Sequence, residues 1–146
     1  MKKLIIPLAI AIIAGVLAGM GGFTFWYARG YSYLSNKPEA CVNCHIMRDN
    51  FNSWAVSSHK NVTCNECHTP HELLPKYLAK FRNGVRHSVA FTFEEVQVPR
   101  TTTRSLDILQ QNCLRCHEAM VGMLFQAREL KSMRCTQCHP TGGHVF

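Results

Sequence analysis

The chain has 146 residues, a length that fits one domain with at most one added anchoring segment and argues against a two-domain enzyme. It contains eight cysteines, more than an ordinary intracellular domain needs, so they serve as disulfides, metal ligands or attachment points for a covalent cofactor. Sixteen Lys and Arg against nine Asp and Glu give a formal net charge of +7. This excess fits a nucleic acid, an anionic lipid surface or an acidic protein as a partner, and charge alone does not choose among them.

The first predicted element is an apolar segment that runs without a charged residue from Leu4 to Ala28. Its 25 residues would form a helix about 37 Å long, at roughly 1.5 Å per residue, and so exceed the ~30 Å hydrocarbon core of a bilayer. Trp26 and Tyr27 stand at its end, where interfacial aromatic residues are common. A cleaved signal peptide is the alternative, but its apolar core normally spans only about 7–15 residues. We therefore predict a retained transmembrane helix.

Two lysines, Lys2 and Lys3, precede this segment. Because positive residues stay on the cytoplasmic side of a membrane, we expect the N-terminus in the cytoplasm and everything after Arg29 outside it. We therefore divide the chain into a cytoplasmic start with a transmembrane anchor, residues 1–29, and a periplasmic domain, residues 30–146. The predicted location is the inner, cytoplasmic membrane, crossed once.

The cysteines fall without remainder into four Cys-x-x-Cys pairs, and each pair is followed at once by histidine. Two thiols three positions apart lie on one helical turn, where each can form a thioether to a porphyrin vinyl group while the adjoining histidine binds the iron. The pattern predicts four covalently bound haem c groups. The attachment residues are Cys41, Cys44, Cys64, Cys67, Cys113, Cys116, Cys135 and Cys138, and the motif histidines are His45, His68, His117 and His139.

Zinc sites and disulfides are the other interpretations of these pairs. Eighteen or nineteen residues separate the pairs within each half of the chain, which is near the spacing of a zinc ribbon. With histidine at 8 of 146 positions, however, chance would place one after all four pairs with a frequency on the order of 10⁻⁵. Disulfides at this spacing would close very small loops and stabilise little. Haem also brings propionates that offset the basic excess, so we predict no nucleic-acid partner.

The second axial ligands of the irons must come from outside the motifs, where the available imidazoles are His59, His71, His87 and His144. His59 has a polar context that gives a core role little support. His144 follows two glycines that let the chain fold back onto a haem face, with an exposed tail as the alternative. Met47, two residues beyond His45, offers a thioether to the same iron or is an ordinary methionine. His71 is as consistent with a surface imidazole as with a ligand.

Between the second and third motifs, apolar residues recur at helical spacing from Leu74 to Val89, and basic residues occupy much of the remaining surface. We interpret this segment as an amphipathic helix at a membrane face. The alternative is a plain solvated helix packed on the haem core, since Asn83-Gly84 weakens its centre. At a membrane face, Lys80 could bind a quinol headgroup and His87 could accept a proton as the quinol is oxidised.

The rest of the exported part also favours helices and loops. Residues 94–103 are typical of a connector, Ser105 can cap a helix that runs into the third motif, and residues 119–134 favour another helix. Four haems in so short a domain must themselves supply most of its buried apolar surface. The predicted fold class is mainly α, with one N-terminal transmembrane helix followed by a compact multihaem c-type cytochrome domain with little regular structure and no sheet.

The chain resembles the tetrahaem quinol dehydrogenase family, which includes the small membrane-anchored subunit of cytochrome c nitrite reductase. The resemblance covers nearly the whole chain and rests on the single anchor, the four motifs in two pairs, the segments Cys41–Met47 and Cys67–His71, and the compact C-terminus. It implies that Met47 binds the first haem iron and that His45 does not. It also implies that His59 and His144 are distal ligands of the third and second haems, and that the last haem takes a lysine from the catalytic partner.

The same resemblance implies a function. Lys80 falls where the family places a quinol-site lysine, whereas His87 replaces a residue that is acidic in some members, which leaves it open as proton acceptor or iron ligand. The family passes electrons from menaquinol to a periplasmic pentahaem cytochrome c nitrite reductase catalytic subunit, on which nitrite is reduced to ammonia. The alternatives are a sister quinol dehydrogenase that feeds nitrate, trimethylamine oxide or another periplasmic reductase, a catalytic multihaem enzyme, and a zinc-ribbon membrane protein.

Overall fold

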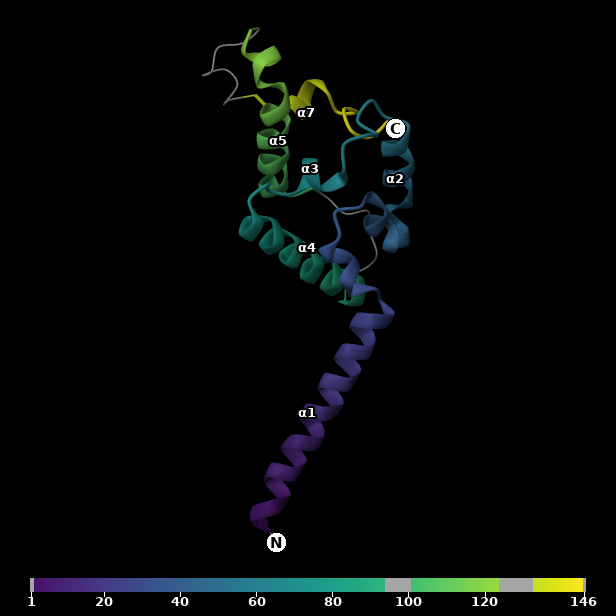
Figure 1. Cartoon of the computed structure of the whole chain (residues 1–146), viewed down its shortest axis with the longest axis vertical. Helices are drawn as coiled ribbons and strands as arrows, with labels where there is room; N and C mark the ends of the chain where they lie inside the picture. Colours follow the sequence, from purple (N-terminus) through teal and green to yellow (C-terminus); the bar gives the residue numbers. More distant parts are fainter. Residues whose placement is uncertain (1, 94–100, 124–132, 146) are drawn as a thin grey trace. The chain divides into compact units, whose positions relative to one another are not determined.

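The computed structural model describes residues 2–93, 101–123 and 133–145 (Figure 1). Its elements are α1 (Lys2–Tyr27), the 3₁₀ helices η1 (Gly30–Leu34), η2 (Pro38–Asn43) and η3 (His45–Met47), then α2 (Arg48–Ala55), α3 (Cys64–His68), α4 (Leu73–Phe93), α5 (Thr103–Gly122) and α7 (Cys135–Cys138). These ranges contain no strand, so the predicted mainly α fold without a sheet is confirmed. The chain divides into two compact units, Met1–Ser32 and Tyr33–Phe146.

Helix α1 dominates the first unit. Its part from Leu4 to Tyr27 is long and apolar enough to cross a membrane, and these residues are exposed throughout. The helix ends because Arg29 adopts a positive φ of 51°, a left-handed conformation that turns the chain out of the helical path. The predicted helix is therefore present as a single-pass membrane anchor.

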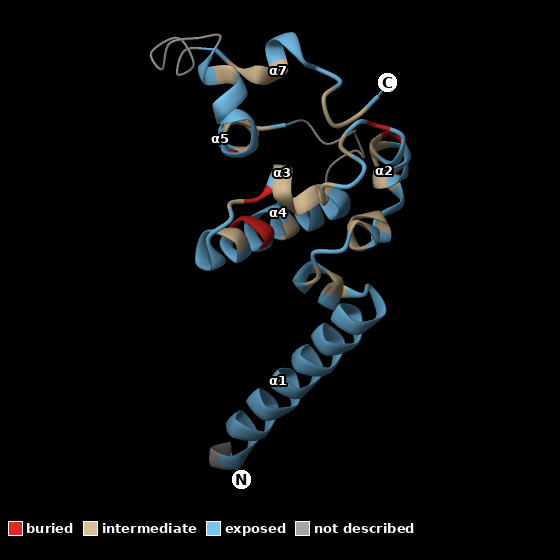
Figure 2. Cartoon of the chain, turned by 45° about the horizontal axis from the view of Figure 1, so that its top comes forward, coloured by how far each residue is buried: buried red, intermediate tan, exposed pale blue. Residues whose placement is uncertain are grey.

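The second unit packs short elements against one another with few buried side chains. Helix α3 contacts α5 and η2, α2 contacts η2 and η3, and α5 contacts α7. Among the described residues, Ala79 is the one buried apolar residue, and most of the ribbon is exposed or half-buried (Figure 2). The buried polar residues are Ser53, Ser57, Thr69, Lys80 and Asn112. Across the part of this unit that the structure describes, polypeptide alone therefore builds almost no apolar core, as expected of a domain whose haems supply the buried surface.

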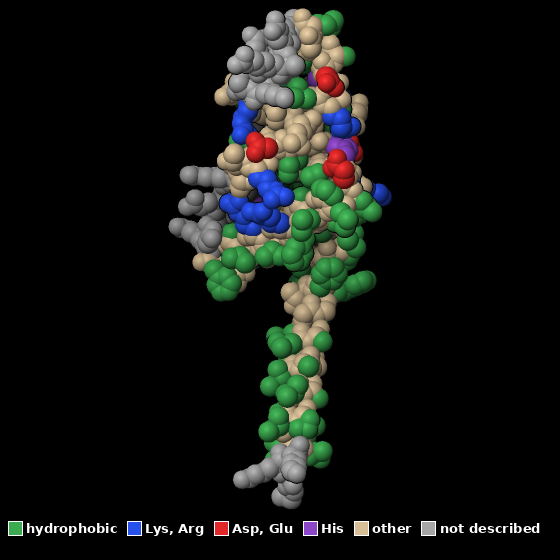
Figure 3. Space-filling model, turned by 90° about the vertical axis from the view of Figure 1, so that its left-hand side faces the viewer, with side chains coloured by type: hydrophobic (Ala, Val, Ile, Leu, Met, Phe, Trp, Pro, Cys, Tyr) green, Lys and Arg blue, Asp and Glu red, His purple; other side chains and the backbone are tan. Residues whose placement is uncertain are grey.

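Helix α4 is amphipathic and unbroken. It continues through Asn83-Gly84, where an added Cβ on Gly84 would lie 3.3 Å from Cε1 of Tyr33, so the glycine allows the helix and this ring to approach closely. Apolar side chains on the helix remain exposed, Leu74 at 83% and Phe81 at 69%. In Figure 3 apolar side chains gather beside Lys and Arg on one face of the molecule.

Helix α5 corrects one detail of the sequence interpretation. Its N-cap is Thr102, whose hydroxyl oxygen accepts a hydrogen bond from the backbone N–H of Ser105 at 3.2 Å. Ser105 therefore lies in the first turn and is not the cap, because the helix begins at Thr103. Of the helix expected over 119–134, residues 119–122 belong to α5 and 124–132 lie outside the described residues.

Candidate haem and quinol site

The thiol pairs lie on short helical turns, as covalent haem attachment requires. Helix α3 begins at Cys64, α5 contains Cys113, α7 begins at Cys135, and the pair Cys41–Cys44 lies at the end of η2. All eight cysteines are exposed or half-buried, and none is paired in a disulfide. In the described ranges no three His, Cys, Asp or Glu side chains gather in a group that could hold a metal ion.

Neighbouring motifs lie on helices that contact each other. The helix η2, which carries Cys41, contacts α3, which begins at Cys64. Helix α5, which contains Cys113, contacts α7, which begins at Cys135. The second and third motifs meet where α3 contacts α5. The four attachment sites therefore form a continuous series in the order of the sequence.

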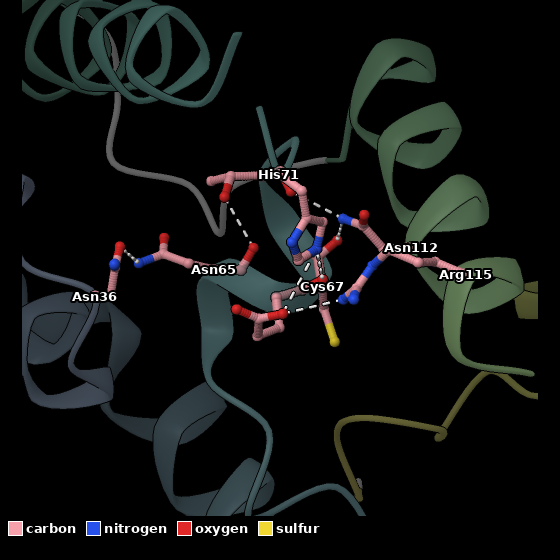
Figure 4. A network of polar contacts seen from close by, with 8 residues as sticks. Asn36, Asn65, Cys67, His71, Asn112 and Arg115 are labelled. Atoms are coloured by element: carbon pink, nitrogen blue, oxygen red, sulfur yellow. Dashed lines mark hydrogen bonds and ion pairs between the residues drawn. The ribbon is translucent and has the colours of Figure 1, made fainter. Parts of the chain in front are cut away.

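A polar network fixes the contact between α3 and α5 (Figure 4). The Nδ2 group of Asn112 donates to the backbone oxygens of Cys67 and Thr69, both at 2.9 Å. Nη2 of Arg115 lies 3.0 Å from Oε2 of Glu66, so one ion pair also links the variable positions of two motifs. Asn112 is buried and satisfied, whereas the ion pair is exposed, so we assign most of the stabilisation at this contact to Asn112.

Two histidines from outside the motifs, His59 and His144, each lie close to a motif histidine. The ring centroids of His59 and His117 lie 6.0 Å apart, and those of His68 and His144 lie 6.1 Å apart. Iron bonds of about 2.0 Å to an imidazole nitrogen on each face would separate two such centroids by about 6.3 Å. The residues present therefore fit a haem iron between the rings of each pair.

The imidazole of His144 has a defined hydrogen-bonding state. Its Nδ1 lies 3.0 Å from the backbone oxygen of Asn50. A carbonyl oxygen only accepts, so Nδ1 carries the proton and Nε2 keeps the lone pair that an iron requires. His59 is held at its backbone, where its N–H donates to Oγ of Ser57 at 3.1 Å.

The other candidate ligands differ in how far they are exposed to solvent. Met47 is half-buried at the end of η3, directly before α2, and His45 is exposed at the start of η3. His139 is exposed directly after α7. His71 contacts Glu66, with Nε2 at 3.3 Å from the backbone oxygen and 3.6 Å from the carboxylate.

Lys80 is buried and engaged in a way that the sequence does not indicate. Its Nζ donates to the backbone oxygens of Tyr33 and Ser35, at 2.9 and 2.7 Å, and to Oδ1 of Asn36 at 3.4 Å. Burial lowers the pKa of Lys80, and Lys76 lowers it further. No helical periodicity indicates these acceptors, because they lie in the segment that follows the anchor.

His87 lies two turns after Lys80 on α4, so the two residues share one face of the helix. Desolvation lowers the pKa of His87, and the positive charge of Arg86 lowers it further. The imidazole is therefore neutral at neutral pH and able to accept a proton.

Comparison with known proteins identifies the family of the chain. Residues 2–144 match the model of the NapC/NirT cytochrome c family, N-terminal region. The chain belongs to this family. Its membership confirms the resemblance found in the sequence, and with the four motifs it confirms the prediction of four covalently bound haem c groups.

Individual members of the NapC/NirT family match over most of their length. The cytochrome c-type protein NrfH of Wolinella succinogenes is 29% identical and covers 91% of this chain and 82% of its own length. The cytochrome c nitrite reductase subunit NrfH of Nitratidesulfovibrio vulgaris is 31% identical, with 81% and 73% covered. The cytochrome c-type protein NapC of Escherichia coli K12 is 30% identical, with 94% and 84% covered.

A solved structure shares the fold. A chain in the crystal structure of the cytochrome c nitrite reductase NrfHA complex bound to the HQNO inhibitor aligns with a TM-score of 0.62 and 26% sequence identity. The alignment covers 92% of this chain and 87% of that chain, so the two chains share their fold almost throughout.

Proposed function

We propose that this chain is a membrane-anchored tetrahaem cytochrome c that oxidises menaquinol and passes the electrons to a periplasmic pentahaem cytochrome c nitrite reductase catalytic subunit. The observation that carries the proposal is the likeness, over 92% of the chain, to a subunit of the NrfHA nitrite reductase complex. That complex was crystallised with the inhibitor HQNO. Nitrite reduction itself takes place on the partner, and this chain is the quinol-oxidising, electron-transfer subunit.

The proposed ligand set follows the positions of the side chains. His68 and His144 hold the second haem and His117 and His59 the third, supported by ring separations of 6.1 and 6.0 Å. When bound, the haems supply one-electron carriers, whose order along the chain matches the series of neighbouring motifs.

The outer haems differ from the inner ones in this proposal. Met47 serves the first haem, and His45 stays off the iron. His139 serves the fourth haem, and its exposed position is compatible with a second ligand supplied by the partner as a lysine. The first haem then receives electrons from the quinol side and the fourth passes them on.

Lys80 and His87 form the proposed quinol site. Lys80 already donates to three acceptors, and the contact with Asn36 Oδ1 is the longest at 3.4 Å. A quinol oxygen would replace this weakest contact and keep the two backbone contacts. His87 accepts a proton from the quinol, supported by its lowered pKa. The exposed apolar face of α4 would lie at the membrane surface, where the quinol resides.

The proposed topology places residues 1–29 in and before the inner membrane and residues 30–146 in the periplasm. Lys2 and Lys3 support a cytoplasmic N-terminus by the positive-inside rule. The similarity to NapC of Escherichia coli favours one second candidate, a sister quinol dehydrogenase that feeds another periplasmic reductase.

One purification tests the cofactor and the partner together. The protein is extracted from membranes in mild detergent, haem per chain is measured as the pyridine haemochrome, and co-purifying proteins are identified by mass spectrometry. Four haems with a pentahaem nitrite reductase is the expected result. Four haems with a different reductase would select the second candidate, and the absence of covalent haem would refute both.

A further inference from the structure

Helix α2 contacts both of the chain segments that carry the facing histidines from outside the motifs. It spans Arg48–Ala55, begins directly after Met47, and lies beside the C-terminal segment (Figure 1). Eight residues form about two turns, roughly 12 Å of helix, so groups along it can reach two separate segments.

The first segment is the C-terminal one. The backbone oxygen of Asn50 accepts from Nδ1 of His144 at 3.0 Å, and Oγ of Ser53 donates to the backbone oxygen of Val145 at 2.7 Å. Ser53 is 8% exposed, so its hydrogen bond is shielded from water. Together the two contacts fix the ring of His144 and the backbone of the next residue.

The second segment is the loop that carries His59. The indole Nε1–H of Trp54 lies within hydrogen-bonding distance of two backbone oxygens, that of His59 at 3.1 Å and that of Val62 at 2.9 Å. From the other side, Oγ of Ser57, which is 4% exposed, accepts the His59 N–H. The N–H and the C=O of His59 are therefore both held by residues in or just after α2.

We propose that α2 positions the distal imidazoles of the two inner haems, with Ser53 and Trp54 as positioning residues for His144 and His59. The inference rests on the proposed ligand set. Helix α2 starts directly after Met47, the proposed ligand of the first haem. It thereby determines how firmly the irons of the second and third haems bind their distal histidines. Loss of a contact loosens the segment and raises the fraction of time that the imidazole leaves the iron.

Carbon monoxide reports this fraction, because it binds a reduced haem iron only when the distal imidazole has left. The experiment uses the purified tetrahaem holoprotein and compares Trp54→Phe and Ser53→Ala with wild type. Asn52→Ala, an exposed position on the same helix, is the matched control. His59→Ala and His144→Ala mark the signal of each haem once its distal ligand is gone. Electron paramagnetic resonance of the oxidised protein follows the same low-spin signals.

We expect His59→Ala and His144→Ala each to add one carbon monoxide per chain over wild type. Trp54→Phe should raise the apparent carbon monoxide affinity of the haem marked by His59→Ala about tenfold, because it removes one N–H donor that is shared between two carbonyl oxygens. Ser53→Ala should raise the carbon monoxide affinity of the haem marked by His144→Ala about fivefold, because it removes one hydrogen bond to one carbonyl oxygen. Asn52→Ala should match wild type.

The positioning role of α2 and the ligand set can be refuted separately. If the histidine variants open a haem but Trp54→Phe and Ser53→Ala behave as Asn52→Ala does, the positioning role is wrong and the ligand set stands. If the histidine variants add no carbon monoxide site, the ligand set itself is wrong. Should Trp54→Phe lose haem during assembly, Ser57→Ala, which removes only the acceptor of the His59 N–H, replaces it with the same expected direction.

Discussion

Lys80 has a structural role that its position on an amphipathic helix does not indicate. From the sequence it is one of several basic residues on an amphipathic helix, available to a headgroup. In the structure its ammonium is buried and donates to backbone oxygens of Tyr33 and Ser35. Its charge therefore both ties α4 to the segment after the anchor and contributes to the proposed quinol site.

Because Lys80 has two roles, Lys80→Met should lower both the stability of the protein and its rate of haem reduction by quinol. The variant leaves three acceptors without their donor, which should lower the free energy of unfolding by about 1–3 kcal/mol. It should also slow haem reduction by quinol and leave reduction by dithionite intact. Thermal denaturation and stopped-flow absorbance measure the two effects, with Lys76→Met as a control that removes an equal charge one turn earlier. Equal quinol rates in Lys80→Met and wild type would exclude Lys80 from the quinol site.

His87 predicts a pH dependence with a definite sign. Its pKa is lowered from the ordinary value of 6.5, so the ring becomes protonated, and unable to accept a quinol proton, only as the pH falls below that value. Quinol-driven haem reduction should therefore rise with pH through the lowered pKa and level off above it. His87→Asn should be slower and lack this rise in the rate profile. A rise that persists unchanged in the variant would show that another group accepts the proton.

The contact between α3 and α5 is the element on which the electron path depends, because it joins the second haem motif to the third. The sequence predicts a helix that runs into the third motif, but it does not indicate which element packs against that helix. Asn112 directly precedes Cys113 of the third motif, and the apolar pattern gives no reason to single it out. Its role becomes visible only where its side chain reaches the backbone oxygens of Cys67 and Thr69.

Asn112→Ala should therefore destabilise the holoprotein by about 1–3 kcal/mol, because two backbone oxygens lose a shared donor in a shielded contact. Arg115→Ala, which breaks the exposed ion pair with Glu66 at the same contact, should cost less than about 1 kcal/mol. Denaturant unfolding followed by far-UV circular dichroism compares the two variants. A larger loss in Arg115→Ala would mean that the ion pair, and not the buried amide, holds the two helices together.

At the scale of the whole molecule, the described residues of the second unit form almost no apolar core of their own. Ala79 is the one buried apolar residue among those described, and the buried positions are otherwise polar. Conformational entropy opposes the folding of such a chain, and side-chain burial alone does not offset it. Covalent haem must provide the missing apolar surface.

Apoprotein made without haem attachment should thus be largely unfolded beyond the anchor. In detergent, α1 should keep its helix, because its hydrogen bonds close within the segment and lipid-like solvent favours it. Far-UV circular dichroism of the apoprotein should therefore show a helix content close to that of α1 alone. The holoprotein should show the helix content of all the helices in the structure. Native-like helix content and cooperative unfolding in the apoprotein would contradict this account.

The sequence by itself determined the features that depend on near neighbours: the anchor, from an uninterrupted apolar run, and the four attachment sites, from thiols and a histidine within one turn. It also predicted α4 from its periodicity. Only the tertiary structure decided what meets across long stretches of chain: His59 with His117, His68 with His144, and Lys80 with Tyr33. The physical reason is that helical spacing encodes contacts within a few residues, whereas these pairs depend on the path of loops that carry no periodic pattern. From the residues alone, His59 and His144 were candidate ligands that were not assigned to a haem. The family resemblance implied the third and second haems for them, and the structure places their rings close to His117 and His68.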